Sequence, residues 1–216
     1  YKRQIHHVCR NYSTNMTESN KIAYYLDANG RYQTKDGILR LVDYAERIGC
    51  IDQIILIEEP YAEHLVVDVS DIPVCLAADE SLHTIQDIQH RVDQGYQATA
   101  IKPAGKTLSL AFHMARASVE NAVIPFVADN ACIPIMAEWN KNISARLPIF
   151  PGLKTGMMES NGPQYYAMWA QLISDYPLPE ASWLAPKSGV FQMNQDYYDN
   201  SGGIFLDPLP YISSFR

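Results

Sequence analysis

The sequence has few cysteines, no long apolar run and no apolar leader. Its four cysteines lie far apart in 216 residues and form no C-x-x-C pair, which favours reduced structural thiols over a disulfide framework or a zinc site. No apolar run approaches the ~20 residues of a membrane-spanning helix, and the N-terminus lacks the apolar core of a secretory signal. We therefore expect a cytoplasmic chain with no membrane partner.

Basic residues are also in deficit. The chain has 17 lysines and arginines against 24 acids, a formal net charge of −7, which argues against non-specific binding to nucleic acid. Apolar residues make up 47% of the chain, enough for a full core in one domain or slightly more. Composition alone therefore indicates a globular chain but names no partner.

Four short apolar runs each end in a charged residue. The runs cover residues 22–27, 54–58, 74–79 and 98–102, and they end in Asp27, Glu58, Asp79 and Lys102. The charged positions are 31, 21 and 23 residues apart, about one strand, one helix and two loops each. Such spacing predicts successive units of a parallel β/α architecture, with the four charged side chains at one edge of the sheet.

Helical periodicity fills the gaps between these runs. We expect helices over 34–49, 84–95, 107–120, 134–146 and 162–175, and two further strands over 124–129 and 153–159. Thr84 and Asp87 form a variant capping box at the start of the second of these helices. Six strand candidates are too few for a closed eight-stranded barrel, so two strands are missing or the sheet is open.

The three acids at the strand ends each have an ordinary interpretation. Asp27, followed by Asn29 and Gly30, could form an Asx turn, and Asp79 could belong to an acid cluster at a helix N-terminus. Glu58 is followed by a second acid, Glu59, and adjacent buried acids repel unless a cation is present. Together the three carboxylates supply the hard oxygen donors that Mg²⁺ prefers.

Lys102 ends the next strand candidate. A lysine near a metal in a partly buried site can act as a base near neutral pH, although it could equally be a salt-bridged lysine. The nearby segment 104–107 (AGKT) suggests a phosphate-binding loop, but that motif needs a glycine where the chain has Ala100. The sequence therefore favours a metal site with an adjacent base over a nucleotide site.

These motifs, Asp27-Ala-Asn29, Glu58-Glu-Pro60, Asp79-Glu-Ser81 and Lys102-Pro, resemble the barrel of the enolase superfamily. The resemblance is closest to the mandelate racemase and muconate lactonizing enzyme branch and covers roughly residues 20–160. It implies a TIM-type (β/α)7β barrel with an N-terminal α+β capping domain. It also implies that Asp27, Glu58 and Asp79 hold Mg²⁺ and that Lys102 is an acid/base, in accord with the lysine base and Mg²⁺ of enolase-superfamily sites.

The resemblance further implies abstraction of the α-proton of a carboxylate substrate to give a metal-stabilised enolate, in a racemase or epimerase, a cycloisomerase or an acid-sugar dehydratase. Glu159 resembles the last-strand acid that hydrogen-bonds the substrate carboxylate. Asp129, with Asn130, occupies the seventh-strand end, where its role is open. The alternative is a non-catalytic or decayed barrel that retains metal or ligand binding.

One departure from the family pattern concerns the second base, and a further expectation concerns the N-terminus. No K-x-K motif that could supply a second base precedes Asp27, since Lys2-Arg3 lies too close to it and indicates the start of a helix. The chain begins with Tyr1, so we expect an N-terminal portion of the same protein to supply the missing strands and the cap.

We expect two parts within the chain itself. Residues 1–176 form the barrel portion with the metal site, and residues 177–216 form an irregular C-terminal segment that packs on the barrel or cap. We also expect a small carboxylate substrate and a homo-oligomer.

Overall fold

The computed structural model describes residues 2–128, 131–207 and 213, and it divides into two compact units. The first unit comprises Tyr1–Ile101, Ser109–Phe126 and Leu147–Met157. The second comprises Lys102–Leu108, Val127–Arg146 and Met158–Arg216. Each unit is described by itself below.

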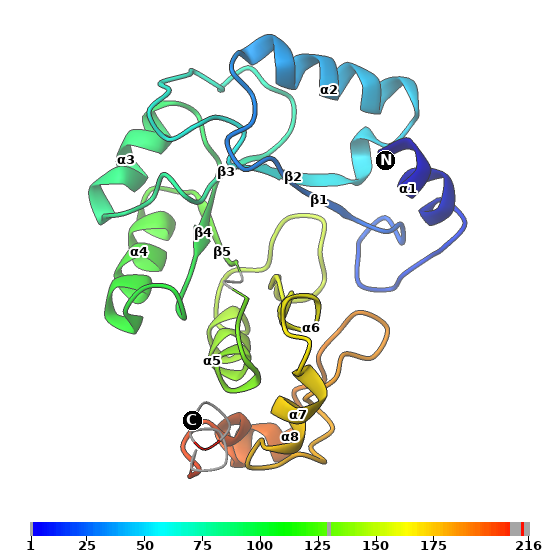
Figure 1. The fold of residues 1–216 in the computed structure, drawn as a ribbon. Helices are drawn as coiled ribbons and strands as arrows, with labels where there is room; N and C mark the ends of the chain where they lie inside the picture. Colours follow the sequence, from blue (N-terminus) through cyan, green and yellow to red (C-terminus); the bar gives the residue numbers. More distant parts are fainter. Residues whose placement is uncertain (1, 129–130, 208–212, 214–216) are drawn as a thin grey trace. The chain divides into compact units, whose positions relative to one another are not determined.

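A curled parallel sheet of five strands, a partial barrel, forms the centre of the first unit (Figure 1). Its strands stand in chain order and are β1 Tyr24–Asp27, β2 Ile54–Glu58, β3 Leu76–Ala78, β4 Ala98–Ile101 and β5 Ile124–Val127. All five coincide with predicted strands. The strands could be predicted from the sequence because strands buried on both faces, such as β3 and β4, consist of continuous apolar runs.

Helices follow β1, β3 and β4, as predicted, but the described residues between β2 and β3 contain none, although the 21-residue spacing predicted one there. The helices of this unit are α1 Lys2–Cys9, α2 Lys35–Arg47, the short 3₁₀ helix η1 Ile51–Gln53, α3 Ile85–Asp93 and α4 Leu108–Glu120. The predicted box at the start of α3 is present in part, because the Asp87 carboxylate accepts the Thr84 backbone N–H at 2.6 Å. This contact satisfies a backbone donor that the helix itself leaves unpaired.

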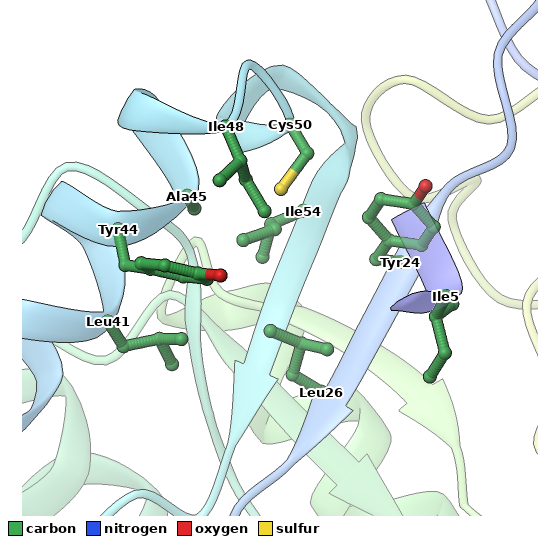
Figure 2. Close-up of a pocket in the computed structure, with 9 residues that line it drawn as sticks. All are labelled: Ile5, Tyr24, Leu26, Leu41, Tyr44, Ala45, Ile48, Cys50 and Ile54. Atoms are coloured by element: carbon green, nitrogen blue, oxygen red, sulfur yellow. The ribbon is translucent and has the colours of Figure 1, made fainter. Parts of the chain in front are cut away.

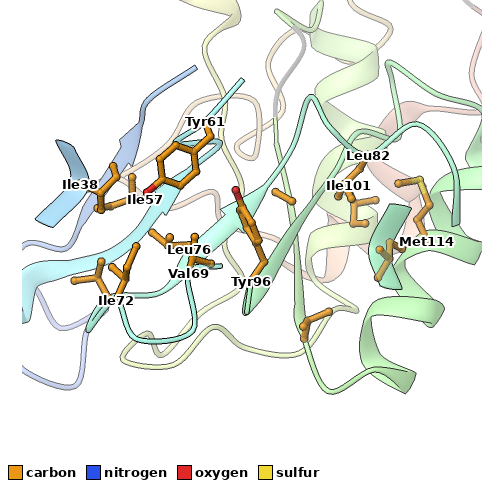
Figure 3. Close-up of a cluster of buried hydrophobic side chains, with 14 of the residues drawn as sticks. Ile38, Ile57, Tyr61, Val69, Ile72, Leu76, Leu82, Tyr96, Ile101 and Met114 are labelled. Atoms are coloured by element: carbon orange, nitrogen blue, oxygen red, sulfur yellow. The ribbon is translucent and has the colours of Figure 1, made fainter. Parts of the chain in front are cut away.

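The apolar core of the first unit lies between the sheet and the helices that cover it (Figure 3). Ile57 and Leu76 project from neighbouring strands, and Ile38, Ile88 and Met114 meet them from α2, α3 and α4. All five side chains are at most 1% exposed. Burial of each such side chain contributes roughly 1.5–3 kcal/mol, so this core holds the strand ends in register.

The second unit is mainly helical, with α5 Pro134–Ser144, α6 Gly162–Tyr165, α7 Trp169–Ser174, α8 Gln195–Asp199 and the 3₁₀ helix η2 Ser201–Gly203. The helix predicted over 162–175 is therefore interrupted. Residues 166–168 break it, with Tyr166 in an extended conformation. Within its described residues, the C-terminal segment also contains α8 and η2, which the lack of periodicity did not indicate.

The strand predicted over 153–159 is wrong as an element. Met158 makes only an isolated parallel bridge to Val127, supported by a 3.0 Å hydrogen bond from the Glu159 N–H to the Val127 carbonyl. Leu153 instead bridges antiparallel to Thr17. The segment thus changes partner between its two ends, which prevents a continuous ladder.

Within the described ranges, no helix combines the length and the apolar character that crossing a bilayer requires.

Candidate metal centre

The three predicted metal-binding acids lie at the carboxyl ends of three adjacent strands. Asp27 ends β1 and pairs in register with Glu58, which ends β2, and Glu58 pairs with Ala77 of β3. Asp79 follows β3 directly. Because neighbouring parallel strands end at the same edge of a sheet, the three residues stand at one edge, and that they bind a common ion stays a prediction.

Glu58 is the electrostatic centre of this group. The pKa of Glu58 is raised to about 9, mainly by burial and then by the repulsion of the neighbouring Asp79 carboxylate. Asp27 raises this pKa more weakly, and the Tyr25 hydroxyl, which donates a hydrogen bond to Glu58, lowers it. The side chain of Glu58 is 2% exposed, so water cannot screen these charges. In the absence of a cation, these surroundings therefore favour the protonated form of Glu58.

Asp27 is held by its own turn. Its Oδ1 accepts the Asn29 backbone N–H at 2.9 Å, and its Oδ2 accepts the Asn29 side-chain amide. The Asx turn that the sequence left open is thus present, and it fixes the exposed carboxylate at the strand end. Such a turn is compatible with a metal ligand, since a carboxylate oxygen has two lone pairs.

The chemistry of these donors fits Mg²⁺. Across the described ranges, no three His, Cys, Asp or Glu side chains already stand in a metal-binding arrangement, so convergence of Asp27, Glu58 and Asp79 on one ion stays a prediction. Two observations nevertheless favour a cation. First, the Glu58 Oε1 atom is buried and has no hydrogen-bond partner among the described residues. Second, Asp79 and Asp27 repel the Glu58 carboxylate, and carboxylates relieve such repulsion by sharing a positive ion.

The second acid of the pair after β2, Glu59, makes a different set of contacts. Its Oε2 accepts the Asp79 backbone N–H at 2.6 Å, the Ser81 hydroxyl at 3.0 Å and, more weakly, the Ser81 N–H at 3.5 Å. Burial raises the pKa of Glu59, while these hydrogen bonds and the charge of Arg91 lower it. No motif in the sequence predicted that Glu59 and Ser81 would pair.

An open groove of about 520 Å³ lies along the loops after β1, β2 and β3. Glu59, Glu63 and Glu80 line it with His64, and no lysine or arginine contributes to its described lining. A second pocket, of about 50 Å³, lies among α1, α2, β1 and β2 and is lined by apolar side chains such as Leu26 (Figure 2). The groove therefore has the polarity of a site for charged ligands, which this apolar pocket lacks.

The other predicted site residues belong to the second unit. Lys102 follows β4, is half-buried, and its carbonyl accepts the N–H groups of Gly105 and Lys106 at 3.1 and 2.9 Å. Glu159 accepts the Asn161 side-chain amide at 3.4 Å. Asp129 lies outside the described residues. The roles of these three residues remain predictions.

Sequence reasoning missed a buried ion pair in the second unit. The Lys141 ammonium donates to the Glu138 carboxylate at 2.6 Å and to the Trp183 carbonyl at 2.8 Å, and it lies 4.2 Å from the centre of the Phe191 ring. Burial is the main cause that raises the pKa of Glu138, to about 7. In the sequence, an acid and a lysine at i, i+3 in a helix resemble an ordinary surface pair. The burial of this pair is therefore evident only from the fold.

Comparison with known proteins gives matches in structure but not in sequence. No family model matches the chain, and no curated protein sequence matches it. The fold superposes on a mandelate racemase/muconate lactonizing protein from Herpetosiphon aurantiacus with a TM-score of 0.56 and 16% identity, over 66% of this chain and 40% of that one. The chain has an enolase-superfamily fold.

Two further solved structures extend this likeness. A 2-chloromuconate cycloisomerase from Rhodococcus opacus 1CP matches with a TM-score of 0.54 and 25% identity, over 66% of this chain and 38% of that one. A muconate lactonizing enzyme from Klebsiella pneumoniae matches with a TM-score of 0.55 and 20% identity, over 69% and 41%. The chain therefore spans about two fifths of the length of these enolase-superfamily structures.

Proposed function

We propose that this chain is part of a Mg²⁺-dependent enolase-superfamily enzyme that removes the α-proton of a small carboxylate substrate. The reaction then continues as a racemisation or epimerisation, a cycloisomerisation or the dehydration of an acid sugar. In this proposal the five-stranded partial barrel is a portion of a (β/α)7β barrel of TIM type.

One observation carries the proposal. Asp27, Glu58 and Asp79 follow three adjacent parallel strands, and the carboxylates of Asp79 and Asp27 both raise the pKa of Glu58. Three mutually repelling carboxylates at one sheet edge are unfavourable without a cation and favourable with one. The match in fold to proteins named as cycloisomerase and muconate lactonizing enzyme supports the reaction type.

The residues of the chain have separate roles in this scheme. Asp27, Glu58 and Asp79 hold the ion, which, when bound, supplies positive charge that makes the α-proton of a carboxylate substrate more acidic. Lys102 takes up that proton at its Nζ. Glu159 hydrogen-bonds the substrate carboxylate and so orients the α-carbon, while Asp129 is a further candidate for proton transfer.

The test is exchange of the α-proton with solvent. A panel of 2-hydroxycarboxylates, acid sugars and N-acylated amino acids is incubated with the chain and MgCl₂ in D₂O, and loss of α-proton signals is followed by ¹H NMR. We expect exchange in at least one class, and none after Asp79→Asn. Mg²⁺ binding without exchange in any class supports the non-catalytic barrel instead, and absence of Mg²⁺ binding contradicts the proposal.

A further inference from the structure

Glu59 stands where the loops after β1, β2 and β3 meet. Its backbone N–H donates to the Ala77 carbonyl of β3 at 2.8 Å, and its carbonyl accepts the Gly30 N–H from the loop after β1 at 2.7 Å. In the sequence, Glu59 directly follows Glu58. The backbone of this single residue therefore joins the strand ends that carry all three predicted metal-binding acids.

The side chain of Glu59 adds a third connection. Its carboxylate, on a residue that is 1% exposed, accepts the Asp79 N–H at 2.6 Å and the Ser81 hydroxyl at 3.0 Å. Hydrogen bonds to a buried charged acceptor are stronger than neutral ones, and leaving the Asp79 N–H without an acceptor would be unfavourable. The position of Asp79 relative to Glu58 is thus fixed through Glu59.

The surroundings of Glu59 support a fixed role. Its φ is +33°, in the left-handed region that favours glycine, and such a conformation persists only where neighbouring structure requires it. The buried Arg91 guanidinium compensates its charge and also donates to the Glu63 carbonyl at 2.8 Å, which restrains the same loop. Gly30 permits the close approach, since an added Cβ would meet the Ala62 Cα at 3.1 Å.

We infer that Glu59 is a positioning residue that holds the loops bearing Asp27, Glu58 and Asp79 in one metal-binding geometry. It does this by hydrogen bonds to loop backbone and Ser81, without being a metal ligand itself. The inference rests on the proposed function, because it concerns the ion that those three acids would hold.

The test compares Mn²⁺ affinity, followed through the EPR signal of free Mn²⁺, with hydrogen exchange of the Asp79 amide. Glu59→Ala removes the acceptor, and loss of such an outer-shell partner should weaken Mn²⁺ binding about 10- to 100-fold while Asp79 amide exchange accelerates. Glu59→Gln keeps an acceptor oxygen but loses the charge, so both readouts should lie between those of the wild type and of Glu59→Ala. Glu46→Gln, which changes an exposed acid on α2 away from the groove, is the matched control and should change neither.

Each outcome decides a different point. Unchanged Mn²⁺ affinity in folded Glu59→Ala overturns the inference and leaves the proposed function intact. Equal losses in Glu59→Gln and Glu59→Ala also overturn it, because charge and not positioning would then be responsible. A wild-type chain without Mn²⁺ affinity overturns the proposed function and the inference together. If Glu59→Ala does not fold, Ser81→Ala decides, with weaker Mn²⁺ binding expected and unchanged binding contradicting the inference.

Discussion

The protonation state of Glu58 gives a quantitative prediction. Its pKa of about 9 in the folded chain lies above the ordinary 4.5, so the folded state keeps a proton that the unfolded state releases between these values. The free energy of unfolding should therefore fall as pH rises through this window, by at most about 1.4 kcal/mol per pH unit. From about pH 5.5 to about pH 7.5 the loss reaches about 2.7 kcal/mol.

Glu58→Gln isolates this contribution. Glutamine has the shape of the protonated acid and can still accept from the Tyr25 hydroxyl, but it does not titrate. The wild-type melting temperature should therefore fall by ~5–10 °C more than that of the variant over the same pH range. Thermal unfolding followed by circular dichroism, without divalent cations, provides the measurement.

An exposed acid outside the candidate site provides the control. Glu46→Gln removes an exposed carboxylate of α2, so its unfolding should keep the pH dependence of the wild type. If Glu58→Gln and the wild type instead show parallel pH dependences, Glu58 is ionised in the folded chain. The reasoning from burial and from the neighbouring carboxylates would then be wrong.

Three further predictions concern other parts of the chain. Gly30→Ala places a Cβ at 3.1 Å from backbone on a residue with φ +66°, so it should lower the melting temperature more than Gly49→Ala, where φ is +74° and no described atom lies within 4 Å of the Cβ. Lys141→Met leaves the buried Glu138 charge uncompensated and should cost about 3–5 kcal/mol in urea unfolding, most of it recovered by adding Glu138→Leu. Lys102→Ala should reduce α-proton exchange by about 10²- to 10⁴-fold without changing Mg²⁺ affinity measured by calorimetry, and Lys102→Arg should not restore exchange.

The sequence predicted the sheet because burial in a parallel sheet leaves a strong local signal. Strands buried on both faces must be apolar throughout, and a charged residue at their carboxyl end marks the sheet edge, as at Glu58 and Asp79. The prediction of a sixth strand over 153–159 was wrong because an apolar run does not determine which segment it pairs with. Leu153 and Met158 are both suited to a strand, yet they pair with different segments.

The candidate site was only partly predictable for a similar reason. Residue type and spacing identified Asp27, Glu58 and Asp79, because carboxylates at successive strand ends need a common explanation. The contact between Glu59 and Ser81 joins two loops across 22 residues, and no periodic pattern encodes such a contact. Its only sequence signal is the adjacent Glu58-Glu59 pair, in which the second acid also needs a partner once it is buried.

The central claim is that three acids form one divalent-cation site, and a crystal structure grown with Mn²⁺ tests it most directly. The anomalous signal of Mn²⁺ locates the ion independently of any assumption about its ligands. We predict one strong peak bound by oxygens of Asp27, Glu58 and Asp79, at about 2.0–2.2 Å on the geometry of Mg²⁺ sites. A peak bound by other residues, or these three side chains directed apart with no peak between them, would contradict the account.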